Sequence, residues 1–118
     1  MRSFLLTLLV LSLVVVSCKK DQATIHGKVT YRDTVANEDK AIDSVTIYLY
    51  QGGSVSGDHV RLTSSSADGA YVFRPLEDNT YSLYAETRID GFIYSAQATG
   101  IVAEKDEMVE VPLNLIKQ

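Results

Sequence analysis

Apolar and polar side chains alternate along most of the chain beyond residue 22, with a period of two residues. Because successive side chains of an extended strand point to opposite faces, this period predicts β-structure. The clearest example contains Val45, Ile47 and Leu49, which alternate with Thr46 and Tyr48. Seven such runs are predicted as strands: residues 25–31, 45–50, 59–63, 71–73, 81–86, 92–99 and 109–115.

The alternation also predicts which side chains face the core. In the fourth run Tyr71 and Phe73 are on the inward side, and Leu76 follows as a further core residue. Each large apolar side chain that becomes fully buried contributes about 1.5–3 kcal/mol to folding. In the third run the inward positions are predicted to be Val60 and Leu62.

Short polar segments between the runs contain turn residues. Asp68-Gly69 and Asp90-Gly91 each stand between predicted strands, and glycine supplies the positive φ that tight turns need. Residues 51–58 form a flexible loop rich in glycine and serine. The charged segment 32–43 is expected to pack loosely at one edge, with a weak helical turn at most. Pro112 has no amide hydrogen, so its strand is predicted at an edge or with its nitrogen facing away from the neighbour.

The N-terminal segment has a different pattern. Residues 4–16 are apolar apart from Thr7 and Ser12, and a positive charge at Arg2 precedes them. As a helix this run would be about 20 Å long, whereas the hydrocarbon core of a membrane is about 30 Å thick. A charged start, a short apolar run and a small residue at its end, here Ser17, are typical of a secretory signal peptide.

The end of this segment, Val15-Val16-Ser17-Cys18, resembles the lipobox of bacterial lipoproteins. The resemblance implies a signal peptide over residues 1–17, cleavage before Cys18 and a diacylglyceryl thioether on the Cys18 sulfur. Residues 18–22 would then be a lipidated tether that attaches the protein to a membrane. The alternative is an ordinary secretory signal that leaves a free thiol, which is a liability in an oxidising compartment.

The residues after Cys18 bear on the location. In proteobacterial lipoproteins an aspartate directly after the cysteine favours retention in the inner membrane, whereas this chain has Lys19 there. The segment Cys18-Lys19-Lys20-Asp21 is also similar to the start of many lipoproteins of the Bacteroidetes. The predicted location is therefore the outer membrane of the cell envelope, and its periplasmic and surface faces remain alternatives.

Length and charge limit the remaining function classes. Residues 23–116 have the length of one small domain. The chain has a net charge of −4 and no basic stripe, which argues against nucleic acid as a partner. Cys18 is the only cysteine, so no disulfide within the chain is available and packing must stabilise the fold.

Several segments of this domain resemble carboxypeptidase regulatory-like domains, which have a prealbumin-like fold. The matching segments are Ile25-His26-Gly27-Lys28-Val29, residues 41–50, Asp68-Gly69-Ala70-Tyr71-Val72-Phe73, Leu76 and Tyr81-Ser82-Leu83. The resemblance covers residues 23–115 and implies a seven-stranded Greek-key β-sandwich over residues 23–116. We also expect Tyr81 to bury its ring while its hydroxyl finds a polar partner. In related proteins such a module is an accessory without chemistry of its own.

The sequence offers few groups for catalysis. His26 and His59 are the only histidines, both predicted on outward positions, and a metal site would need further ligands near them. No Gly-x-Ser-x-Gly, phosphate-binding loop or His-Glu-x-x-His motif occurs. The transthyretin-like hydrolases of the urate pathway have a related fold, but their C-terminal Tyr-Arg-Gly-Ser is missing. We therefore predict no catalytic residue, no metal and no cofactor.

An isopeptide-stabilised, adhesin-type domain is an alternative. The segment from Glu86 to Phe92 resembles the Glu-Thr-x-Ala-Pro-x-Gly-Tyr segment of collagen-adhesin B-type domains, without its proline. The resemblance implies a bond between Lys28 and Asn114, assisted by Glu86. Such a bond needs a buried triad that shifts the lysine toward its neutral form, but the alternation predicts all three side chains on outward positions.

Three tyrosines, Tyr48, Tyr50 and Tyr84, also occupy outward positions of their strands. On neighbouring strands they would form a patch, and patches of rigid aromatic rings often mark contact sites for proteins or sugars. Alternatively, cross-strand tyrosine pairs only stabilise the sheet.

Together these patterns predict a membrane-anchored, non-catalytic binding or structural module of the bacterial cell envelope. Its expected partners are the membrane, through Cys18, and another envelope protein or a glycan. An accessory subunit of a surface complex for glycan or nutrient capture is the second interpretation.

Overall fold

A computed structural model describes residues 22–33 and 35–118 of the chain. The predicted signal peptide, the predicted lipidation site Cys18 and the tether as far as residue 21 lie outside the described residues. Within the described part all regular structure is β-strand, and no residue of it lies in a helix. The predicted all-β class is therefore confirmed.

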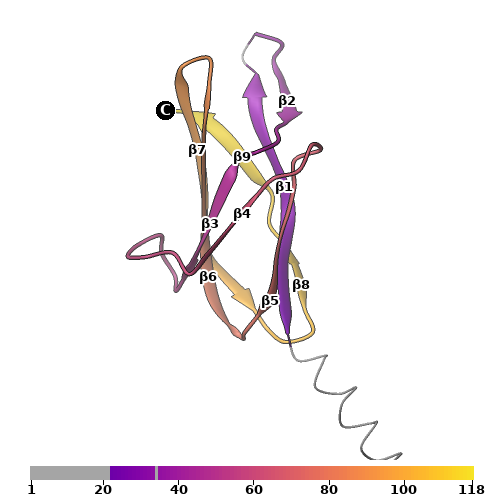
Figure 1. The fold of residues 1–118 in the computed structure, drawn as a ribbon, viewed down its shortest axis with the longest axis vertical. Coiled ribbons are helices and arrows are strands. Elements are labelled where there is room, and N and C mark those ends of the chain that lie inside the picture. Colours follow the sequence, from indigo (N-terminus) through magenta and orange to yellow (C-terminus); the bar gives the residue numbers. More distant parts are fainter. Residues whose placement is uncertain (1–21, 34) are drawn as a thin grey trace, which may run out of the picture.

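Nine strands follow one another along the chain (Figure 1). They are β1 (Ala23–Asp33), β2 (Glu38–Ala41), β3 (Thr46–Gln51), β4 (Arg61–Ser64), β5 (Ala70–Leu76), β6 (Asn79–Ile89), β7 (Phe92–Ala103), β8 (Met108–Glu110) and β9 (Leu113–Lys117).

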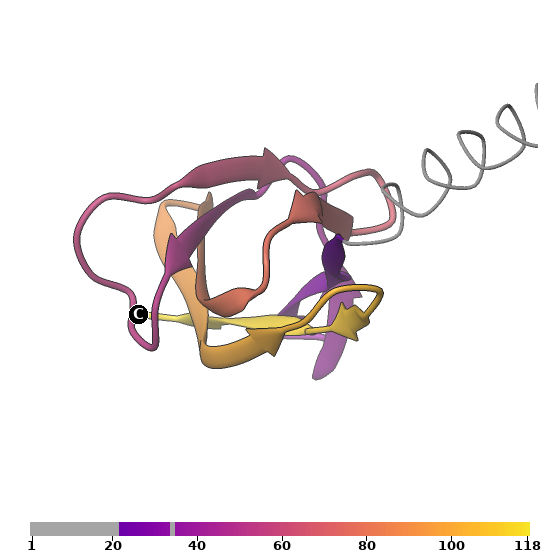
Figure 2. The same ribbon diagram turned by 90° about the horizontal axis from the view of Figure 1, so that it is seen from below.

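Strand β1 is the centre of the hydrogen-bonding pattern. Its first half pairs antiparallel with β5 and parallel with β8, and its second half pairs antiparallel with β2 and parallel with β9. Strand β9 also pairs with β7, and the order continues through β6 and β3 to β4. Seen from the end, the sheet curls around the core (Figure 2).

The curled sheet has two layers, one of β4, β3, β6 and β7 and the other built around β1. Strand β9 joins the layers on one side, because it pairs with both β1 and β7. On the other side the Arg61 guanidinium of β4 donates hydrogen bonds to the backbone oxygens of Pro75, at 2.6 Å, and Arg74, at 2.9 Å. Arg61 therefore links β4 to the end of β5, with which β4 has no ladder.

The prediction of seven strands is wrong in two places. The charged segment 32–43 contains a strand, because β2 extends β1 into a hairpin through a turn at residues 35–37. The predicted last strand is divided into β8 and β9, and the break includes Pro112, whose missing amide hydrogen prevents a continuous ladder.

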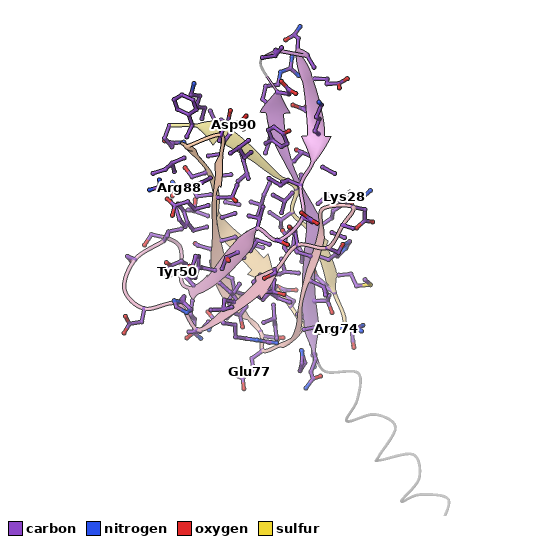
Figure 3. All side chains as sticks on the ribbon, turned by 45° about the horizontal axis from the view of Figure 1, so that its top comes forward. Lys28, Tyr50, Arg74, Glu77, Arg88 and Asp90 are labelled. Carbon is purple, nitrogen blue, oxygen red and sulfur yellow. The ribbon has the colours of Figure 1, made fainter. Side chains whose placement is uncertain are left out.

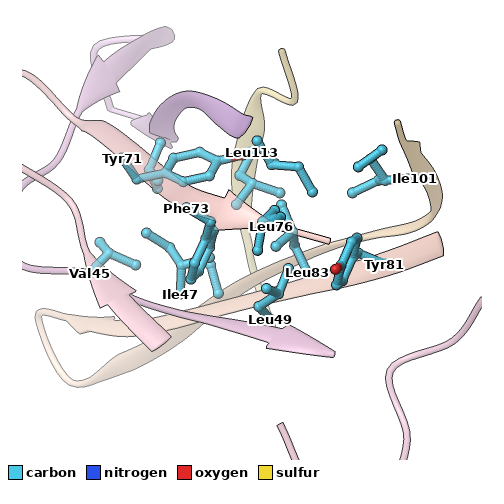
Figure 4. Packing of buried hydrophobic residues seen from close by; sticks show 14 of the residues in the cluster. Val45, Ile47, Leu49, Tyr71, Phe73, Leu76, Tyr81, Leu83, Ile101 and Leu113 are labelled. Atoms are coloured by element: carbon cyan, nitrogen blue, oxygen red, sulfur yellow. The ribbon is translucent and has the colours of Figure 1, made fainter. Parts of the chain in front are cut away.

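The core lies between the two layers (Figure 4). The predicted burial of Tyr71, Phe73, Leu76 and Tyr81 is confirmed, since each is at most 4% exposed. The Tyr81 hydroxyl also has the expected polar partner, because it donates to the Glu77 backbone oxygen at 2.8 Å. The remaining buried hydrophobic residues are Ala23, Ile25, Val29, Val45, Ile47, Leu49, Leu83, Ala85, Tyr94, Ile101, Ala103, Leu113 and Leu115.

The predicted inward positions of the third run are wrong. Val60 and Leu62 are 51% and 55% exposed. Ser65 is buried instead, and its hydroxyl accepts from the Val45 amide at 3.0 Å and donates to the Ile42 carbonyl at 2.8 Å. These bonds and the antiparallel ladder with β3 fix the register of β4, which turns Leu62 outward.

Candidate functional site

The outer surface of the layer β4-β3-β6-β7 contains a row of side chains that crosses all four strands. The ladders place Leu62 beside Tyr48, Tyr48 beside Tyr84, and Tyr84 beside Gln97. Cross-strand neighbours of this kind share one face of a sheet. The row therefore lies on the outside of the molecule, opposite the face that contributes Ile47 and Leu49 to the core.

Aromatic rings lie close together on this surface. The ring centroids of Tyr48 and Tyr84 are 6.5 Å apart, and the ring planes are inclined by 31°. The His59 ring stands steeply against both Tyr48, at 5.0 Å and 65°, and Tyr50, at 6.3 Å and 76°. We call these four residues, Tyr48, Tyr50, His59 and Tyr84, the tyrosine face.

The tyrosine face is only partly covered. Its three tyrosines are half-buried and His59 is exposed. Figure 3 shows Tyr50 beside the long loop between β3 and β4, on the side of the molecule away from Lys28. The rings are therefore accessible to a partner from outside. They are not part of the buried core on the opposite face of the sheet.

Hydrogen bonds hold the surroundings of the tyrosine face in place. The Tyr84 hydroxyl donates to Glu86 Oε1 at 3.1 Å. Partial burial, together with this carboxylate, raises the pKa of Tyr84 above its usual value, so the hydroxyl remains a proton donor over the physiological range. Next to Tyr50, the Ser82 hydroxyl donates to the Gly52 backbone oxygen at 2.9 Å, and the Gly52 amide donates to the Thr80 backbone oxygen at 2.7 Å.

The structure brings the three predicted tyrosines together, on neighbouring strands β3 and β6. The sequence prediction did not include His59 and Leu62 in this group. His59 reaches Tyr48 and Tyr50 because the loop between β3 and β4 returns the chain beside β3, which is a tertiary effect. The alternation of this run placed Leu62 on the inner face and is wrong there, so it was not a dependable signal for either residue.

The two histidines lie in different layers of the sheet. His26 lies on β1, beside Val72 of β5 and Glu110 of β8, whereas His59 precedes β4 in the other layer. Among the described residues no group of three or more histidine, cysteine, aspartate or glutamate side chains is arranged to hold a metal ion.

The arrangement does not support the isopeptide alternative. Lys28, Glu86 and Asn114 are all exposed, so they lack the dry environment that the bond requires. Asn114 Oδ1 accepts a hydrogen bond from the Thr30 hydroxyl at 3.3 Å, and Glu86 accepts from Tyr84. They are exposed because each occupies an outward position of its strand, as the alternation predicted.

A cleft of about 250 Å³ lies between the hairpins β1–β2 and β6–β7. Its lining includes Asp33, Phe92 and Lys117, and the Lys117 ammonium is 3.6 Å from the centre of the Phe92 ring. Figure 1 shows these hairpins at the end of the domain opposite Ala23, where β1 begins. The cleft is therefore separate from the tyrosine face.

The part of the chain that the structure describes contains no helix with the length and apolar character needed to cross a membrane.

No protein-family model and no curated protein matches the sequence. The carboxypeptidase regulatory-like resemblance therefore stays a prediction.

The fold is similar to that of solved structures that include a pilin and a proposed carbohydrate-binding protein. A minor pilin of the Gram-positive pathogen Streptococcus agalactiae has a TM-score of 0.57 and 15% identity, over 83% of this chain and 45% of the pilin. A proposed carbohydrate-binding protein of Pseudomonas aeruginosa has a TM-score of 0.57 and 12% identity, over 80% of this chain and 88% of that one. An alternative pilotin of the type II secretion system of Vibrio cholerae has a TM-score of 0.49 and 19% identity, over 80% of this chain and 96% of the pilotin.

The chain spans less than half of the pilin's length. The likeness to the pilin and to the Pseudomonas aeruginosa protein, at 15% and 12% identity, indicates a shared β-sandwich fold alone.

Proposed function

We propose that this protein is a non-catalytic binding module of the bacterial cell envelope, which holds its partner on the tyrosine face. The observation that carries the proposal is the group of four rings on the outside of the sheet, in contact with one another and accessible. Rigid aromatic side chains bring large contact area at low entropic cost, which suits them to binding surfaces.

A purely structural role explains this surface less well. Cross-strand tyrosine pairs do stabilise sheets, but Tyr48 and Tyr84 are only one such pair. His59 and Tyr50 extend the group beyond that pair, and His59 comes from outside the ladders of β3 with β4 and β6. The His59 ring therefore adds to this surface without taking part in a cross-strand pair of the sheet.

The predicted anchor suits the same role. A tether from Cys18 to β1 is about five residues long, so it reaches at most about 17 Å. Lipidation at Cys18 would hold the domain close to the membrane, with its two hairpins at the far end (Figure 1). The tyrosine face would then be on the flank of the domain, within reach of envelope components.

The proposal is tested by retention of envelope material on the immobilised full-length protein. Wild-type protein is expected to retain protein or carbohydrate from an envelope extract, and the double variant Tyr48→Ser/Tyr84→Ser to lose it. Phe92→Ser is the matched control, because it removes a half-exposed ring outside the tyrosine face. Equal retention by all three proteins, with unchanged melting temperatures, contradicts the proposal.

A further inference from the structure

We infer that the ligand of the tyrosine face is a short, neutral oligosaccharide. This inference rests on the proposed function, since it assigns a ligand class to the same surface. Three features of the face lead to it, namely its size, the chemistry of its side chains and the balance of its charges.

The face is too small for a stable protein partner. The row that contains the face crosses four strands about 4.8 Å apart, and the outward positions of β3 from Thr46 to Tyr50 span about 14 Å, so the area around the rings is on the order of 200 Å². A specific protein interface buries about 800 Å² on each partner. The area around the rings is instead close to the area that two or three sugar rings cover.

The side chains suit the two surfaces of a sugar. A pyranose ring has a face of C–H groups that packs on an aromatic ring, and the Tyr48 and Tyr84 rings, inclined by only 31°, provide two such positions side by side on neighbouring strands. Hydroxyl groups at the sugar's edge need hydrogen-bond partners. Around the rings the exposed side chains of Glu86, Gln97 and Ser64 supply them, all on the same outward face.

The charges of the face favour a neutral ligand. Glu86 and Arg88 are two residues apart on β6, so both lie on its outer side and their opposite charges share one surface. Arg61, next to Leu62, directs its guanidinium to the backbone oxygens of Arg74 and Pro75. The described part of this surface therefore offers no cluster of cations for a phosphorylated or acidic polymer.

The loop between β3 and β4 limits the face at one end. It begins at Gly52, whose backbone is hydrogen-bonded to Thr80 and Ser82. Near its other end His59 packs on Tyr48 and Tyr50. Figure 2 shows this loop extending outward from the sheet. An oligosaccharide lying across the strands would therefore have His59 and the loop as a side wall.

The first experiment is affinity electrophoresis of the full-length protein in detergent. The gels contain glucomannan, xylan or mixed-linkage β-glucan as neutral probes, and alginate as an acidic one. We expect retardation by a neutral probe, weakened at least about tenfold in Tyr48→Ser and in Tyr84→Ser. Phe92→Ser, which removes a half-exposed ring outside the face, is expected to bind as wild type.

The second experiment treats the envelope extract before the retention assay, with periodate to destroy sugars or with protease to destroy proteins. Loss of face-dependent retention after periodate alone supports the inference. Loss after protease alone, or retardation by alginate alone, overturns it and leaves the proposed function intact. Retention that persists in Tyr48→Ser/Tyr84→Ser overturns the proposed function and the inference together.

Discussion

At the residue scale, close approaches of backbone segments decide which positions need glycine. A Cβ atom added at Gly27 would lie 2.1 Å from the Val111 carbonyl oxygen. That oxygen also accepts a hydrogen bond from the Tyr71 hydroxyl, and the Val111 amide donates to the His26 oxygen at 2.8 Å. Gly27 therefore lets the connection between β8 and β9 pack directly on β1.

Replacement of Gly27 by alanine is expected to lower the free energy of unfolding by about 2–3 kcal/mol, because backbone atoms must move to admit the methyl group. Gly53→Ala is the control, since a Cβ there meets nothing within 4 Å and φ is not positive. Urea denaturation followed by circular dichroism measures both. A Gly27→Ala protein as stable as Gly53→Ala would show that Val111 is not in this position.

At the scale of elements, the hairpin β1–β2 depends on ion pairs more than on apolar packing. All four residues of β2 are exposed. The Lys40 ammonium is 2.9 Å from Asp33 Oδ2, and the Val35 and Ala36 amides donate to Asp33 Oδ1 at 3.0 and 3.2 Å. The Lys40 ammonium and these amides hold the pKa of Asp33 below its usual value.

This lowered pKa predicts the pH dependence of the hairpin. The stabilisation by Asp33 is present above its unfolded-state pKa of about 3.9, and it is lost as the pH falls through the lower folded-state pKa. We expect Asp33→Asn to lower the protection of the β2 amides from hydrogen exchange at neutral pH. In the wild type we expect low pH to lower this protection, once each rate is divided by the intrinsic exchange rate at that pH. Exchange in β6 is the internal reference, and equal rates in wild type and Asp33→Asn would contradict the prediction.

At the scale of the whole molecule, β1 connects β5 and β8 to β2 and β9, and it also sets the orientation of the domain. It begins at Ala23, next to the predicted tether, and ends in the hairpin at the opposite end (Figure 1). Any anchor before β1 therefore fixes which end of the domain is far from the membrane.

Replacement of Cys18 by alanine is expected to abolish the predicted lipidation, because the predicted thioether would form on that sulfur. Incorporation of radiolabelled palmitate and membrane fractionation measure the effect, with Ser17→Ala as a control that keeps a small residue before the cysteine. Wild-type protein without label and in the soluble fraction would contradict the predicted lipoprotein.

The two-residue period correctly predicted the β-class and the core positions of β3 and β5, and the residue types predicted the turn at Asp90-Gly91, where φ is positive at both residues. These features are local, because the two-residue period and the turn chemistry act within a few residues. The outward side of Leu62 and the contact of His59 with the tyrosines could not be predicted in this way. Each of these depends on register and on the neighbouring strand, which are set by segments distant in sequence.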